Sequence, residues 1–175
     1  MIPRRFTAAL AFAAAAALSA VPHPATATPG EVAIGGTLRD ARLNGLTAPP
    51  TQLSAFFGKP LIINVWASWC GPCRSEMASL DKLAGRYGKR HFRVIGISTD
   101  DYPEKAFSFL ERSRTGFDNF IDAKLELENM LGADRLPLTL LVDAKGRVLA
   151  KHYGARDWDS TESRAMIAKA FGFKP

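Results

Sequence analysis

Apolar residues along the chain form two kinds of pattern, which predict alternating strands and helices. Continuous apolar runs rich in β-branched residues, typical of strands buried on both faces, occupy 61–66, 92–98 and 136–143. Apolar residues at helical spacing occupy 72–87, 104–114, 125–131 and a last segment that Ser160 can cap. Because helices separate the early strands, we expect these strands to pair in parallel.

Shorter segments complete the predicted sheet. Further strands are expected at 38–46, 117–121 and 148–153. The turn at 144–147 joins the strands on either side of it, so this late part of the sheet is predicted to be an antiparallel hairpin. The order predicts an α/β fold with a mixed central β-sheet flanked by helices and an N-terminal β extension.

Each helical segment has one apolar face. In the helix at 72–87 this face consists of Met77, Leu80, Leu83, Ala84 and Tyr87. In the helix at 104–114 we expect Phe107 and Leu110 to point inward. Pro72 suits the first turn of its helix, where a missing N–H costs nothing.

The first residues have the pattern of a cleaved secretory signal at 1–27. Arg4 and Arg5 precede an alanine-rich apolar stretch at 8–21, and Ala25-Thr26-Ala27 supplies the small residues of a cleavage site. The stretch is shorter than the roughly 20 residues of a membrane-spanning helix, although an uncleaved anchor is the alternative. The rest, 28–175, is predicted to be one domain, exported to the periplasm.

The charge pattern changes this picture little. The net charge is +6, and the cations are scattered along the chain instead of forming a block with aromatic residues. A scattered set of this kind is typical of solvated helix faces, so no nucleic-acid partner is expected.

The chain has two cysteines, Cys70 and Cys73, in the C-x-x-C spacing after a strand and before a helix. In an exported protein they could form a structural disulfide. A bridge between residues three apart closes a very short loop and stabilises little, so the pair is more consistent with redox chemistry of the thioredoxin-like kind.

The predicted position of the pair indicates how it would react. A helix N-terminus offers free N–H groups and a positive dipole end, which lower the pKa of a nearby thiol. We therefore expect Cys70 to be the nucleophile and Cys73 to resolve the mixed disulfide, a cycle that can run in either direction. Glu76 shares a helix face with Cys73 and is a candidate proton acceptor, or else a solvated helix glutamate.

Two polar features have simpler explanations than catalysis or metal binding. Asn64, alone in its apolar strand, is expected to find a hydrogen-bond partner inside the core. A zinc site would need four ligands, and His91 and His152 are isolated in the sequence, so we expect neither a metal nor another cofactor.

The segment Trp69-Cys70-Gly71-Pro72-Cys73 resembles the active-site motif of thioredoxins, and residues 64–73 together resemble the TlpA/ResA-like periplasmic thiol-disulfide oxidoreductases. The resemblance extends over about 31–173 and implies a thioredoxin-like fold. This family has a glutamate three residues after the second cysteine, which supports a proton-shuttle role for Glu76.

The same resemblance implies a substrate-facing surface. Its residues would be Trp69, Gly71, Pro72, Leu136 and Pro137, with Pro137 in the cis form and the backbone of Leu136 pairing with a substrate segment. The segment 154–158 resembles the late loop of the family. Arg135 and Leu138 differ from the residues common in the family at this rim, so the resemblance does not identify the client protein.

By this resemblance the protein is expected to be a monomeric periplasmic reductase. Its partners would be disulfide-containing client proteins, such as apo-cytochrome c or copper-site cysteines of oxidases, and a membrane electron donor of the DsbD/CcdA type. The alternatives are a disulfide oxidase or isomerase that uses the same cysteines, a peroxidase, and a non-enzymatic metal-chaperone or structural domain.

Overall fold

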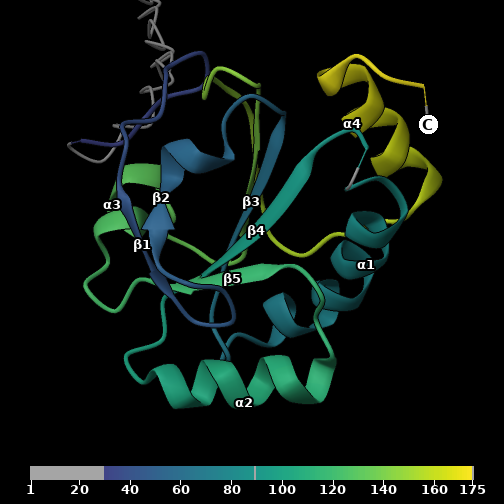
Figure 1. The fold of residues 1–175 in the computed structure, drawn as a ribbon. Helices are drawn as coiled ribbons and strands as arrows, with labels where there is room; N and C mark the ends of the chain where they lie inside the picture. The colour runs from purple at the N-terminus through teal and green to yellow at the C-terminus, as the bar shows by residue number, and fades with distance from the viewer. Residues whose placement is uncertain (1–29, 89, 175) are drawn as a thin grey trace, which may run out of the picture.

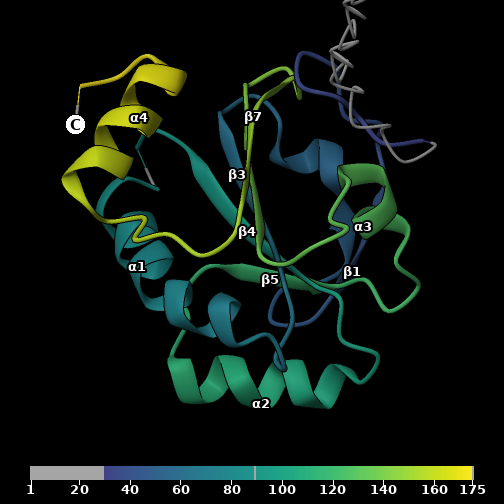
Figure 2. The same ribbon diagram turned by 180° about the vertical axis from the view of Figure 1, so that it is seen from behind.

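A computed structural model describes residues 30–88 and 90–174, so the predicted signal at 1–27 lies outside the described residues. The strands are β1 (Arg42–Gly45), β2 (Thr51–Gln52), β3 (Leu61–Trp66), β4 (Arg93–Ser98), β5 (Asp118–Ile121), β6 (Leu138–Val142) and β7 (Val148–Tyr153). The helices are α1 (Gly71–Tyr87), α2 (Pro103–Ser113), α3 (Glu126–Leu131) and α4 (Thr161–Phe171), with a 3-10 turn at Leu53–Phe56. Figures 1 and 2 show their arrangement from opposite sides.

The strands form one mixed seven-stranded sheet in the order β2-β1-β5-β4-β3-β6-β7. Strand β3 pairs in parallel with β4, and β4 pairs in parallel with β5. Strand β6 pairs antiparallel with both β3 and β7. The predicted parallel part, late hairpin and N-terminal extension are therefore confirmed.

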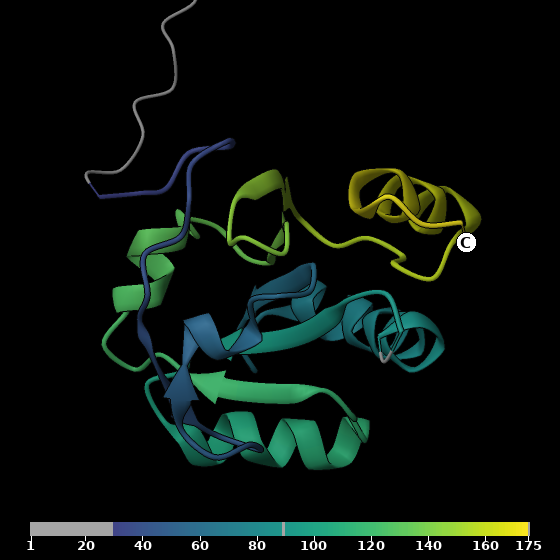
Figure 3. The same cartoon turned by 45° about the horizontal axis from the view of Figure 1, so that its top comes forward.

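Helices cover both faces of the sheet. Leu80 of α1, Leu110 of α2 and Ile167 of α4 pack into one core together with both cysteines. Leu131 of α3 and Leu53 of the 3-10 turn pack into a second core on the other face. Figure 3 shows α4 and α1 on one side of the molecule and α3 on the other. The redox motif thus lies on the α1 face.

Most predicted local features agree with the structure. Ser160 caps α4, since its hydroxyl accepts from the Ser163 N–H at 3.2 Å. Met77, Leu80 and Leu83 are buried, as expected for the inner face of α1. Among the described residues, none of the helices has the length and apolar content needed to cross a membrane.

The prediction for α2 was wrong at one position. Phe107 is 41% exposed, whereas Leu110 is buried as expected. The buried stripe of this helix runs through Ala106 and Leu110, four residues apart, and Phe109 packs against Trp66. Phe107 lies one position beyond that stripe, which turns it about 100° away from the core.

Candidate redox site

Strand β3 leads into the cysteine pair, and α1 begins directly after it. Cys70 is the N-cap of α1, with extended backbone angles, and Pro72 lies in the first turn. The two cysteines form a disulfide, and the Cys73 N–H donates to Cys70 Sγ at 3.2 Å. Cys70 keeps 6% of its surface exposed and Cys73 only 1%. The pair therefore has an outer and an inner sulfur, as predicted.

The predicted substrate-facing residues differ in exposure. Trp69 is 70% exposed, and Gly71 and Pro72 are also exposed. The Leu136–Pro137 peptide bond is cis, as the resemblance implied, and it precedes β6. Leu136 packs against the core cluster that contains both cysteines. Leu136 is half-buried and Pro137 is buried, so within the predicted surface only Trp69, Gly71 and Pro72 are exposed.

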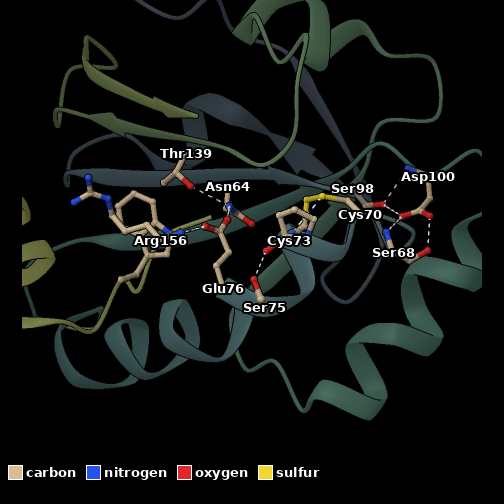
Figure 4. The surroundings of a disulfide bond; sticks show 12 residues. Asn64, Ser68, Cys70, Cys73, Ser75, Glu76, Ser98, Asp100, Thr139 and Arg156 are labelled. Carbon is tan, nitrogen blue, oxygen red and sulfur yellow. Dashed lines mark hydrogen bonds between the residues drawn. A yellow bond between two sulfur atoms is a disulfide. The ribbon is translucent and has the colours of Figure 1, made fainter. Parts of the chain in front are cut away.

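Glu76 is buried on α1, one turn after Cys73, and is only 2% exposed. Its Oε1 accepts from Asn64 Nδ2 at 2.8 Å, and its Oε2 accepts from Trp158 Nε1 at 3.0 Å and from the Arg156 backbone N–H at 3.1 Å. Figure 4 shows the carboxylate pointing toward β3. The alternative of a solvated helix glutamate is therefore wrong.

Burial and hydrogen bonding act in opposite directions on the pKa of Glu76. Loss of solvent raises its pKa above the usual 4.5, while the hydrogen bonds from Trp158, Asn64 and Arg156 oppose this rise. A raised pKa makes the ionised carboxylate a stronger base and therefore a better proton acceptor.

Asn64 has the core hydrogen bonds that its position in β3 predicted. Besides Glu76, its Nδ2 donates to Thr139 Oγ1 at 3.0 Å, across the β3–β6 pair. Its Oδ1 is buried without a protein partner. His152 of β7 lies opposite Thr139 of β6 in the sheet. Burial, together with the Arg156 charge, lowers the pKa of His152 below 6.5.

The sequence reasoning missed a second buried carboxylate, Asp100, which is 2% exposed. Its Oδ2 accepts from the Ser68 N–H at 2.8 Å and from Ser98 Oγ at 2.7 Å, and its Oδ1 accepts from Ser68 Oγ at 2.6 Å. Figure 4 shows it on the far side of the disulfide from Glu76. The sequence did contain a signal for this position. Asp100 comes just after the end of β4, and the parallel strand β3 ends at the same edge of the sheet.

Trp158 was also missed as a site residue, although its loop had been singled out. It is fully buried, and its ring lies edge-on to His152 at 5.8 Å between centroids. Its indole N–H is one of the donors to Glu76, so the segment after β7 closes the site from the side of α4. A lone tryptophan gives no sequence signal of such a bond.

A family model described as Redoxin matches residues 33–167, which is most of the chain. The chain belongs to the Redoxin family. Two curated redoxin relatives carry more specific names. Thiol-disulfide oxidoreductase ResA of Geobacillus thermodenitrificans is 31% identical over 117 residues, covering 67% of each chain. Thiol:disulfide interchange protein DsbE of Vibrio cholerae is 33% identical over 148 residues, covering 79% of this chain and 78% of the relative.

Solved structures agree with this assignment. The redoxin fold seen here matches that of a Chlorobium tepidum protein assigned as thiol:disulfide interchange protein DsbE, with a TM-score of 0.75 and 28% identity over 81% of this chain and all of the other. The peroxidoxin BcpB of Mycobacterium tuberculosis also matches, with a TM-score of 0.67 at 22% identity over 79% of this chain and 98% of the other. This second likeness shows the fold alone.

This redoxin is therefore a ResA/TlpA-like member of the thioredoxin superfamily and a thiol-disulfide oxidoreductase with a C-x-x-C cysteine pair. Within 30–88 and 90–174, the structure shows no group of three or more side chains suited to hold a metal ion.

Proposed function

We propose that this oxidoreductase reduces disulfides in client proteins, with Cys70 as the attacking sulfur. One observation carries the assignment of Cys70 as the attacking sulfur most directly: Cys70 Sγ, at the N-cap of α1, accepts the Cys73 N–H. In the reduced protein the same amide and the helix dipole would face a thiolate, and both would lower its pKa.

The reaction moves two electrons from the dithiol to the client. The Cys70 thiolate attacks one sulfur of the client disulfide, a mixed disulfide forms, and the other client sulfur leaves as a thiolate that takes up a proton. Cys73 then loses its proton and attacks Cys70 Sγ. The client leaves with both cysteines reduced, and the Cys70–Cys73 disulfide seen here is the product.

Glu76 serves the second step. Cys73 is buried and must be deprotonated before it can attack, and Glu76 lies one turn away on the same helix. The raised pKa of Glu76 makes this carboxylate a stronger proton acceptor for the Cys73 thiol. Asn64, Trp158 and the Arg156 amide fix the orientation of its two oxygens.

The client would contact the exposed residues Trp69, Gly71 and Pro72, together with the half-buried Leu136 that precedes the buried cis Pro137. In the cell the dithiol would be regenerated by a membrane dithiol donor of the DsbD/CcdA type. Clients would be cysteine pairs of the kind found in apo-cytochrome c or in copper sites of oxidases, by likeness to the relatives named ResA and DsbE.

We place the mature protein in the periplasm because 1–27 has the pattern of a cleaved signal. The mass of the exported chain tests this. A mature N-terminus at Thr28 is expected, and a chain retained in the membrane with residues 1–27 attached would contradict it.

The direction of electron flow is tested by the reduction potential of the pair, equilibrated against glutathione or dithiothreitol. A value near or below about −220 mV, on the thioredoxin side of the scale, supports a reductase. A value near about −120 mV would make the protein a disulfide donor instead. Consumption of peroxide without a disulfide client would assign it to the peroxidases.

A further inference from the structure

A groove of about 610 Å³ lies beside the redox motif, between α1 and α2. Ser68 lines it two residues before Cys70, and Arg74 lines it directly after Cys73. The helix α2 contributes Lys105, Phe109 and Arg112. A polypeptide bonded to Cys70 would therefore have this groove immediately next to it.

The groove carries unbalanced positive charge. Its lining holds three cations, Arg74, Lys105 and Arg112, against a single carboxylate, Glu104. The side chains of all four are exposed, and none forms a salt bridge within the described part of the chain. Lys105 Nζ lies 4.7 Å from the centre of the Tyr102 ring, which holds this cation beside an exposed aromatic side chain.

The groove on the other side of α1 differs in this respect. It is lined by Lys82 and Arg156 together with Glu76, Asp157 and Asp159, so cations do not outnumber carboxylates. Asp159 is moreover paired with Arg86 and Arg164. Of these two grooves, only the one that faces α2 has more cations than carboxylates.

We propose that the α1–α2 groove binds an acidic stretch of the protein that exchanges a disulfide with Cys70. The inference rests on the proposed function and adds the chemistry of its partner. Three cations free of ion pairs attract a run of aspartate and glutamate side chains, and the hydroxyl of Ser108 offers them a hydrogen bond. Phe109 supplies apolar contact for the aliphatic parts of the segment.

The test uses two disulfide-bonded peptides of equal length, one with aspartate and glutamate beside its cysteine and one with asparagine and glutamine at the same places. The rate at which the reduced protein reduces each is measured at low and at high salt. At low salt the acidic peptide should react about tenfold faster than the neutral one, because complementary charge raises the association rate. Salt should remove most of this difference.

Removing the cations should abolish the preference. In the triple variant Arg74→Gln, Lys105→Gln, Arg112→Gln the two peptides should react within about twofold of each other. The matched control removes the same charge elsewhere, by Arg90→Gln, Lys145→Gln and Lys169→Gln, all exposed residues outside the groove. The control should keep the preference.

Charge reversal gives a second, independent measurement. Changing Arg74, Lys105 and Arg112 to Glu should make a peptide with lysines beside its cysteine react faster than the acidic peptide. Circular dichroism of each variant checks that it is folded, and the neutral peptide reports the disulfide chemistry separately.

Several outcomes would overturn the proposal. Equal wild-type rates on both peptides, or the same loss of preference in the control triple, would show that the groove selects nothing. Inhibition by vesicles of anionic lipid at lower concentration than by the acidic peptide would assign the groove to a membrane surface instead. If the neutral peptide itself is not reduced, the proposed function fails, and this result is distinct from a lost preference.

Discussion

Two buried carboxylates lie on opposite sides of the disulfide, and they are held in different ways (Figure 4). Glu76 receives its hydrogen bonds from two parts of the chain, namely Asn64 of β3 and the loop before α4, which supplies the Arg156 N–H and the Trp158 indole. Asp100 receives its bonds from Ser68 and Ser98, which belong to the ends of β3 and β4. One carboxylate sits behind the inner sulfur, and the other holds the segment that leads to the outer one.

The difference shows that the two sides of the motif have different tasks: one carboxylate holds the chain in position, and the other can exchange a proton. Asp100 accepts a backbone N–H and a hydroxyl from Ser68, so it fixes the chain two residues before Cys70. Glu76 holds no part of the motif loop, and burial raises its pKa. We therefore interpret Asp100 as a positioning residue and Glu76 as the proton carrier, and the following predictions test that separation.

The largest expected effect is on the resolving step in Glu76→Gln. Loss of the proton acceptor should slow the attack of Cys73 on the mixed disulfide about a hundredfold, as for other general bases. Rapid mixing followed by acid quenching should show the mixed disulfide accumulating, while the first attack by Cys70 keeps its rate. The exposed Glu111→Gln serves as the control. Equal slowing of both steps would contradict a role confined to resolution.

Asp100→Asn should reverse this pattern and act mainly on stability. An amide offers one acceptor oxygen where the carboxylate offers two, so bonds to Ser68 or Ser98 are lost inside the protein. We expect the free energy of unfolding to fall by about 2 kcal/mol. Urea denaturation of the oxidised protein measures this, with the exposed neighbour Asp101→Asn as control.

The rates of Asp100→Asn complete that test. Both steps of the cycle should change together, through the position of the motif loop, and the pH profile of resolution should stay in place. A selective loss of the resolving step in this variant would remove the distinction between the two carboxylates.

Trp158→Phe should have a smaller effect, of about 1 kcal/mol on the free energy of unfolding, because it removes one buried hydrogen bond and a little volume. The diagnostic result is the pH profile. The indole N–H favours the ionised form of Glu76, so its loss should move the midpoint for resolution to higher pH. The midpoint should stay unchanged when Trp158→Phe is added to Glu76→Gln.

The smallest expected effect is the pH dependence of stability contributed by Glu76. Its pKa is higher in the folded protein than the usual 4.5, so between these two values the folded state holds more protons than the unfolded state. This contribution is complete below pH 4.5 and is lost as the pH rises through the folded pKa. The free energy of unfolding of the wild type, minus that of Glu76→Gln, should therefore fall with rising pH.

A difference that rises with pH would show that the hydrogen bonds outweigh burial at Glu76. His152 contributes the opposite slope, because its pKa is lowered in the folded protein. Taking the difference between the wild type and the variant removes that contribution.

The sequence predicted the elements that depend on local patterns. The strand at 61–66 and the helix after it agree with β3 and α1, because an apolar run, a first-turn proline and a regular apolar face act over neighbouring residues. Phe107 shows the limit of that reasoning, because the pattern placed Phe107 and Leu110 on the inner face, whereas the packing buries Ala106 and Leu110.

The sequence alone determined the spacing of the cysteines and their place at a helix N-terminus, since four consecutive positions fix both. Only the tertiary structure decided the environment of the pair. Asn64 and Trp158 lie 12 and 82 residues from Glu76, and Ser68 lies 32 from Asp100. Such contacts depend on how the sheet brings β3, β4 and the loop after β7 together, and a residue's burial follows from that arrangement and not from its own neighbours in the chain.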